Sequence, residues 1–237
     1  MRRIFAAAAF SLLVAQTAQA QDKDQKTIEG NGKLVTRTVD VKSFDALTAS
    51  GVYELKLSQG ATESVKIEAD ENLQELFHVR NDGSKLVIEM EKLKNTNLKS
   101  KNKMRVYVTF KKLKDLELST VGGVSSEKRL AFDDLEFSNK GVGNVELNLT
   151  ANKITVENKG VGNMVLSGKA QEAVFTNKGV GNFEAGDFVV QTVDIENNGI
   201  GSAQVNAEKG LKVKDNMMGK VKNKGAAPIR RKNKVTI

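Results

Sequence analysis

The chain contains no cysteine and no tryptophan, and it has a single proline, Pro228. The absence of cysteine excludes disulfides, thiolate catalysis and cysteine metal sites. Aromatic residues make up only 5% of the chain, which leaves few rings to stack on bases or sugars. The remaining residues are rich in valine, leucine, isoleucine, asparagine, lysine and glycine. That composition is typical of strands joined by tight turns.

The first twenty residues, MRRIFAAAAFSLLVAQTAQA, have the pattern of a secretory signal peptide. Arg2 and Arg3 precede an apolar run, and Ala18 and Ala20 form a small-x-small cleavage pattern. The run is too short to cross a bilayer, and no cysteine follows the cleavage position for acylation. We therefore expect residues 1–20 to be removed and the mature chain to be exported, without a transmembrane segment.

Apolar residues alternate with period two from Leu34 onward, as in "VYELKLS" (52–58) and "RVYVTF" (105–110). Residues 71–79 predict one helical turn, and the lysine-rich residues 91–103 predict an exposed loop. The chain as a whole predicts an all-β protein. Its expected parts are a flexible segment 21–33 and a single domain 34–237, divided into irregular coils 34–115, regular repeats 116–220 and a C-terminal cap 221–237.

A repeated hexapeptide is the most informative feature of the sequence. "NKGVGN" occurs at 139–144, 158–163 and 177–182, and "NNGIGS" follows at 197–202, so that the copies lie 19, 19 and 20 residues apart. A unit of this length is too short for a strand-helix-strand repeat. It predicts one coil of a parallel β-solenoid, in which neighbouring coils stack about 4.8 Å apart.

Each unit also has its own alternating apolar row, which we expect to face the core and to stack on the row before it. The predicted inward residues are Val145, Leu147, Leu149, Ile154, Val156, Met164, Leu166, Ala173, Phe175, Phe183, Ala185, Val193, Ile195, Ala203, Val205, Leu211 and Val213.

The glycines of the hexapeptide favour a structural corner over a nucleotide site. Each copy lacks the third glycine of a G-x-G-x-x-G loop, and no helix signal follows. Glycine at a corner takes positive φ without a steric penalty, and stacked asparagine amides could bond from coil to coil. The predicted turn residues are Gly141, Gly143, Gly160, Gly162, Gly179, Gly181, Gly199, Gly201, Asn139, Asn158, Asn177 and Asn197.

The lysines of the hexapeptide, Lys140, Lys159 and Lys178, have two interpretations. They could solvate the corner and discourage unwanted strand pairing. Alternatively, stacked in a column, they could bind an anionic glycan or another envelope polymer. Asn198 interrupts the column in the fourth copy, and the shortage of aromatic residues argues against specific nucleic-acid recognition.

The sequence offers no catalytic set. Asp133 and Asp134 are adjacent and would point to opposite faces of a strand, and His78 is the only histidine. Glu136, Glu157 and Glu196 share a register that Thr176 interrupts. We therefore predict no catalytic residue, metal or cofactor, with a polysaccharide-active lyase or hydrolase as the alternative.

Residues 41–90, "VKSFDALTASGVYELKLSQGATESVKIEADENLQELFHVRNDGSKLVIEM", followed by the glycine-asparagine repeats, resemble the GIN domain family, the head domain of an auto-transporter adhesin that is common in Bacteroidetes. The resemblance covers about residues 35–220. It implies a right-handed parallel β-helix, exported to the periplasm or cell surface of a Gram-negative bacterium, with no catalytic residues. We therefore expect a non-enzymatic protein that presents a binding surface, as an adhesin or a cell-envelope interaction protein; a purely structural envelope protein is the other alternative.

Overall fold

The computed structural model of the protein describes residues 26–91, 95–215 and 220–231. The predicted signal peptide lies outside the described residues. Nearly all the regular structure is β-strand, and 17 strands join in one continuous sheet, while a separate sheet has two. Among the described residues no helix has the length and apolar character that crossing a membrane requires.

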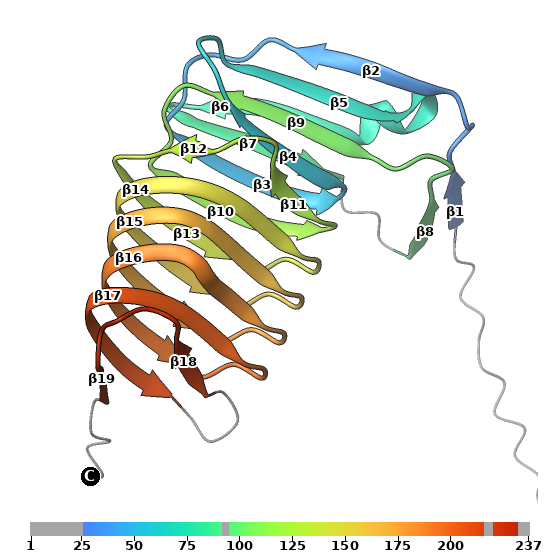
Figure 1. The fold of residues 1–237 in the computed structure, drawn as a ribbon. Helices are drawn as coiled ribbons and strands as arrows, with labels where there is room; N and C mark the ends of the chain where they lie inside the picture. The colour runs from blue at the N-terminus through green and yellow to red at the C-terminus, as the bar shows by residue number, and fades with distance from the viewer. Residues whose placement is uncertain (1–25, 92–94, 216–219, 232–237) are drawn as a thin grey trace, which may run out of the picture.

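The two-stranded sheet is formed by β1 (Lys26–Glu29) and β8 (Thr96–Lys99), which run parallel. It lies beside the main body (Figure 1), and Ile28 and Leu98 pack against the core. Part of the segment expected to be flexible, and part of the loop expected at 91–103, are therefore strands.

The N-terminal half of the large sheet, here called the head, contains the elements β2 (Leu34–Val39), β3 (Ala46–Val52), β4 (Glu54–Gln59), β5 (Ser64–Asp70), the 3-10 helix η1 (Glu71–Leu76), β6 (Phe77–Asp82), β7 (Lys85–Met90) and β9 (Arg105–Phe110). The helix η1 confirms the helical turn predicted within 71–79. Strands β2 and β9 both pair antiparallel with β5, and β6 pairs antiparallel with β7. Strand β3 pairs in parallel with β7, and β4 pairs in parallel with β9.

The predicted fold class, a right-handed parallel β-helix through residues 34–237, is wrong. The antiparallel pairs of the head make the large sheet a mixed one, and this mixed sheet wraps around a common core (Figure 1). The link between β6 and β7 shows why the pairing there is antiparallel. It consists of only two residues, Gly83, with φ 59°, and Ser84. So short a link can only form a hairpin, because parallel neighbours need a longer crossover.

The C-terminal half, here called the stack, contains the repeats. Its strands are β10 (Asp115–Val121), β11 (Val124–Ser126), β12 (Leu130–Ala131), β13 (Asp134–Asn139), β14 (Val145–Asn158), β15 (Met164–Asn177), β16 (Phe183–Asn197), β17 (Ala203–Asp215), β18 (Val221–Asn223) and β19 (Ile229–Arg231). Each turn of the stack pairs in parallel with the next, and β10 and β11 also pair in parallel with β3 and β4 of the head.

The spacing of the hexapeptides is reproduced in the register of the stack. Asn139 pairs with Asn158, Asn158 with Asn177, and Asn177 with Asn197. The one interval of 20 residues contains a register shift, in which Val165 pairs with Glu184 but Ser167 with Asp187. The extra residue is thus absorbed as a bulge in β16, and the next corner returns to register.

The core runs without a break from the head through the stack. Every one of the 17 residues predicted to face inward in the repeats is buried, so that prediction is confirmed. Phe175 and Phe183 come from successive turns of the stack, and their ring centroids are 4.9 Å apart. Because each turn buries its apolar row against its neighbours, a single turn would have no core of its own.

A buried carboxylate holds the link between β8 and β9 against the head. Asp70, at the end of β5, is 0% exposed. It accepts hydrogen bonds from the backbone N–H of Lys101 (2.9 Å) and the side-chain amide of Asn102. Burial raises the pKa of Asp70, but the hydrogen bonds from Asn102 and Lys101 outweigh it, so that the pKa lies below its ordinary value.

Acid is therefore expected to weaken this link. The pKa of Asp70 is lower in the folded protein than in the unfolded chain, where an aspartate has a pKa of about 3.9. Its ionised carboxylate therefore stabilises the fold at pH values above about 3.9. That stability is lost as the pH falls through the folded pKa. Urea unfolding at a series of pH values should show the free energy of unfolding decreasing below about pH 5. In Asp70→Asn the decrease should be smaller. Equal decreases in both proteins would show that Asp70 is not a source of the acid sensitivity.

Candidate binding surface at the repeated corners

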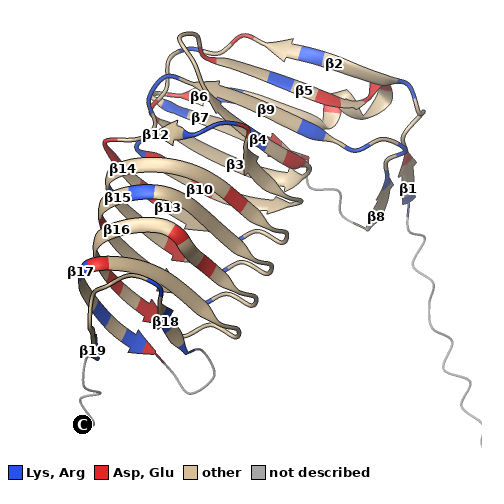
Figure 2. Ribbon diagram, viewed as in Figure 1, with Lys and Arg blue, Asp and Glu red and all other residues tan. Residues whose placement is uncertain are grey.

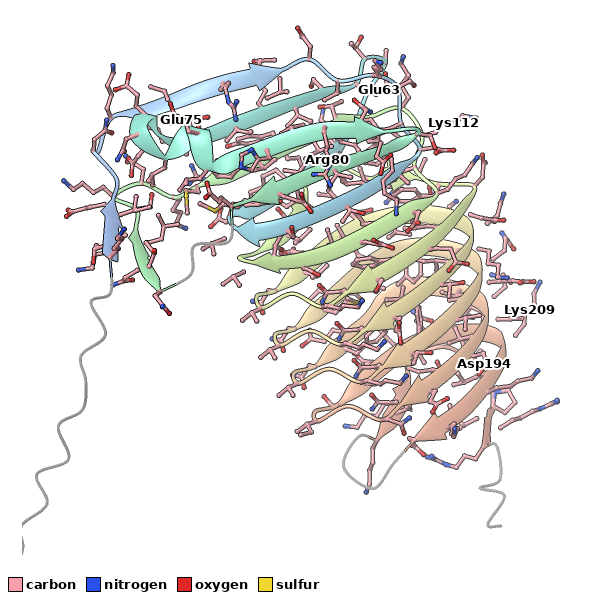
Figure 3. The ribbon with its side chains drawn as sticks, turned by 180° about the vertical axis from the view of Figure 1, so that it is seen from behind. Glu63, Glu75, Arg80, Lys112, Asp194 and Lys209 are labelled. Atoms are coloured by element: carbon pink, nitrogen blue, oxygen red, sulfur yellow. The ribbon has the colours of Figure 1, made fainter. Side chains whose placement is uncertain are left out.

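The hexapeptides form a set of sharp corners along one edge of the stack. Figure 1 shows them as a row of narrow loops between successive strands, and Figure 3 shows the same loops from behind. Main-chain hydrogen bonds join each corner to the next: Val142 N–H donates to Thr120 O (2.8 Å), and Gly143 N–H donates to Val161 O (2.8 Å). The corners are therefore part of the hydrogen-bonded ladder, and their geometry is fixed.

The two glycines of each corner are needed for different reasons. Gly143, Gly162, Gly181 and Gly201 have φ between 127° and 136°, which glycine adopts without penalty. The other column, Gly141, Gly160, Gly179 and Gly199, does not share this positive φ, so backbone conformation explains only one of the two glycine columns. There the limit is space: a Cβ on Gly160 would lie 2.7 Å from the carbonyl oxygen of Gly141.

The asparagines form a buried ladder directly before the corners. Asn139 Nδ2 donates to Asn158 Oδ1 (2.8 Å), Asn158 Nδ2 to Asn177 Oδ1 (2.8 Å), and Asn177 Nδ2 to Asn197 Oδ1 (2.7 Å). The Oδ1 atom of Asn158 also accepts the backbone N–H of Gly160 at 3.2 Å. Asn139, Asn158 and Asn177 thus each connect two turns of the stack and satisfy a main-chain donor at the corner.

The lysine column is partly neutralised by a carboxylate. Lys159 Nζ lies 2.6 Å from Glu157 Oε1, and Lys178 Nζ lies 3.6 Å from the same oxygen. The hydrogen bond from Lys159 lowers the pKa of Glu157, and the charge of Lys178 adds to that effect. At Lys140 the residue two positions earlier is Ser138 rather than an acid. Figure 2 shows basic and acidic segments mixed over the stack, so the column is not part of a wholly basic face.

The corners also carry an exposed row of aliphatic side chains, which we call the apolar ridge. Its members are between 45% and 53% exposed: Val52, Val121, Val142, Val161, Val180 and Ile200. Val52 pairs in register with Val121 at the junction of head and stack, and parallel bridges continue the row from Val121 to Ile200. Sequence reasoning missed this surface. The sequence did contain a pattern that indicates it, because the residue between the two glycines is apolar in every copy of the hexapeptide.

The acidic residues considered for catalysis lie elsewhere. Asp133 and Asp134 are exposed and line a groove of about 550 Å³ together with Lys112 and Lys153. Lys112 lies at the edge opposite the corner loops (Figure 3). His78 is exposed on β6. In the ranges that the structure describes, no group of three or more histidine, aspartate or glutamate residues could hold a metal ion.

The fold is all-β, and its repeated corners form one continuous outer row that gives the protein an extended surface. A comparison with known families assigns the chain: residues 43–227 match the family described as "putative auto-transporter adhesin, head GIN domain", and the chain belongs to that family. No curated protein matches the chain significantly.

Solved structures agree with this assignment. A putative adhesin from Bacteroides fragilis is 30% identical, with a TM-score of 0.73, and the match covers 86% of this chain and 99% of that one. A putative lipid binding protein from Parabacteroides distasonis is 18% identical, with a TM-score of 0.59 and coverage of 88% and 100%. A putative adhesin from Parabacteroides merdae is 22% identical, with a TM-score of 0.53 and coverage of 88% and 100%. At these identities the last two show a similar fold alone.

Proposed function

We propose that this protein is an exported, non-enzymatic binding protein of the adhesin type, and that it makes contact through the apolar ridge. Export is supported by the pattern of residues 1–20, and adhesion by the family to which the chain belongs. The expected location is the periplasm or the outer surface of a Gram-negative cell.

The single observation that carries this proposal is the half-exposed row of six aliphatic side chains. The fold explains the glycines beside them but not the side chains themselves. The main chain of Val161, for example, is bonded to the neighbouring turns through its N–H and its C=O, and any residue other than proline could supply those groups. Threonine would fit the corner equally well and would expose less apolar surface to water. An ordered row of apolar side chains on a surface is typical of a contact site.

Adherence can be measured with the substitutions Val142→Thr, Val161→Thr and Val180→Thr combined in one variant. Each replaces a methyl group, worth about 0.8 kcal/mol when it is buried in a contact, by a hydroxyl group that favours water. We expect fluorescent beads that carry residues 21–237 to adhere to intact Gram-negative cells, and the triple variant to lose roughly tenfold or more in the apparent affinity. Because the three side chains point into solvent, the thermal midpoint should change little.

The matched control replaces the lysine column instead, with Lys140→Gln, Lys159→Gln and Lys178→Gln. Since Glu157 already neutralises part of that column, these changes should weaken bead adherence less than the threonine variant does. If the threonine variant adheres as well as the parent protein, the ridge is not the contact surface. If the lysine variant alone fails, the contact is electrostatic and the basic column is the site.

A further inference from the structure

We propose that the partner of the apolar ridge is the surface of an anionic lipid bilayer, on which the protein lies along its row of corners. This inference rests on the proposed function, because it names the partner of the same surface. The ridge runs from the junction of head and stack to the last hexapeptide, and Figure 1 shows the corner loops of the stack along one edge of the sheet. With strands about 4.8 Å apart, six members make a line roughly 24 Å long.

The chemistry of three of the six corners is layered in the direction that a bilayer requires. At Val142, Val161 and Val180 the aliphatic residue stands at the middle of the corner loop, with a lysine two residues before it and an asparagine two residues after it. Asn144 and Asn163 are such amides; their Oδ1 atoms accept the backbone N–H of Asn163 and Asn182, each at 3.0 Å. Aliphatic tips can therefore enter the boundary of the acyl chains while ammonium and amide groups remain among the headgroups.

The shape of the ridge favours a flat, deformable partner. A straight row on a projecting edge touches a plane along its whole length, whereas a rigid protein would need a matching groove. An extended peptide could not add to the edge as a further strand, because the corner N–H and C=O groups already bond to neighbouring turns. Two ridges placed tip to tip would bury only a narrow strip, less than the roughly 800 Å² per partner of a stable dimer.

Charge favours an anionic surface over a neutral one. The full chain has a formal net charge of +8, and residues 21–237 keep +6 of it because Arg2 and Arg3 lie in the predicted signal peptide. Lys140, Lys159 and Lys178 each stand two residues before a valine of the ridge. Each lysine near an anionic membrane contributes modestly, and salt screens that contribution. Glu157 offsets part of the attraction. We therefore expect binding to require the ridge in all conditions. Anionic lipid should strengthen that binding.

The test is flotation of residues 21–237 with vesicles of phosphatidylcholine alone and of phosphatidylcholine mixed with phosphatidylglycerol. We expect the protein to float with the mixed vesicles, and the variant Val142→Thr, Val161→Thr, Val180→Thr to bind at least tenfold more weakly. A control variant places threonine at exposed apolar residues outside the ridge, with Leu34→Thr, Val174→Thr and Val189→Thr. That control should float within twofold of the parent.

The lysine variant separates the two contributions. Replacing Lys140, Lys159 and Lys178 by glutamine should weaken binding to the mixed vesicles severalfold and leave binding to phosphatidylcholine unchanged. Circular dichroism of all variants checks that they remain folded, so that a loss of flotation reports the surface rather than the fold.

Three results would overturn the inference. They are no flotation of the parent with mixed vesicles, equal flotation of the parent and the ridge variant, and a parent that is a dimer by light scattering while the ridge variant is a monomer. The last result would make the ridge an interface between copies. If beads lose adherence with the ridge variant but vesicles do not bind, the proposed function stands and the lipid partner is wrong.

Discussion

Replacing Gly162 by alanine is expected to destabilise the protein by roughly 3 kcal/mol or more. Gly162 has φ 130°, and a Cβ at that position would lie 2.4 Å from the carbonyl oxygen of Gly143 in the preceding turn. That oxygen belongs to the main chain of a corner held on both sides by hydrogen bonds, so it cannot move aside without breaking the ladder. Chemical denaturation followed by circular dichroism measures the loss directly.

Gly83→Ala is the matched control for this prediction. Gly83 also has a positive φ, 59°, but no atom lies within 4 Å of the position that a Cβ would take. Its replacement therefore tests the backbone conformation without the steric clash, and we expect a cost of about 1 kcal/mol. If the two alanine variants lose the same stability, the close approach of successive corners is not what requires glycine at 162.

Removing one member of the asparagine ladder is expected to have the other large effect. Asn158→Ala leaves the Nδ2 donor of Asn139 and the backbone N–H of Gly160 without their acceptor in a buried place. Each unsatisfied buried group costs about 1–3 kcal/mol, so that the free energy of unfolding should fall by roughly 2–6 kcal/mol. The exposed Asn152, replaced by alanine, should cost less than about 0.5 kcal/mol.

Asn158→Asp distinguishes the ladder from simple packing. The aspartate keeps an acceptor for Asn139 and Gly160, but when ionised it faces Asn177 Oδ1 without a proton to donate. Burial disfavours the charged form, so the folded protein should hold this carboxyl protonated and its pKa should rise above the unfolded value. The stabilising contribution of the protonated form is then lost as the pH rises. Denaturation at acid and neutral pH should show this trend, and a pH-independent loss would contradict the ladder.

The periodic half of the protein was readable from the sequence. The inward rows, such as Val145, Leu147 and Leu149, are buried as the alternation indicated, and the hexapeptides stack in the register that their spacing implied. Both succeed for one reason: a repeat that cannot bury its apolar row alone must place equivalent residues next to one another.

The head was not predictable in the same way. An alternating strand such as Val65–Ala69 has the same pattern whether its neighbour is parallel or antiparallel, and β5 proved antiparallel to both β2 and β9. One signal was available and unused: Asp82-Gly83 between two alternating segments is typical of a hairpin. The lysine column stays a prediction, but attention to the charge of Lys159 left the apolar residue two positions later unexamined.

By itself, the sequence determined which residues of this protein recur, which of them face the core, and where the chain must turn sharply, because those properties depend on local spacing and side-chain type. Only the tertiary structure decided the direction of strand pairing in the head, the pairing of Lys159 and Lys178 with one carboxylate, and the alignment of six aliphatic side chains into one exposed ridge. These depend on which distant segments become neighbours, and side-chain alternation along a single strand carries no information about its partner.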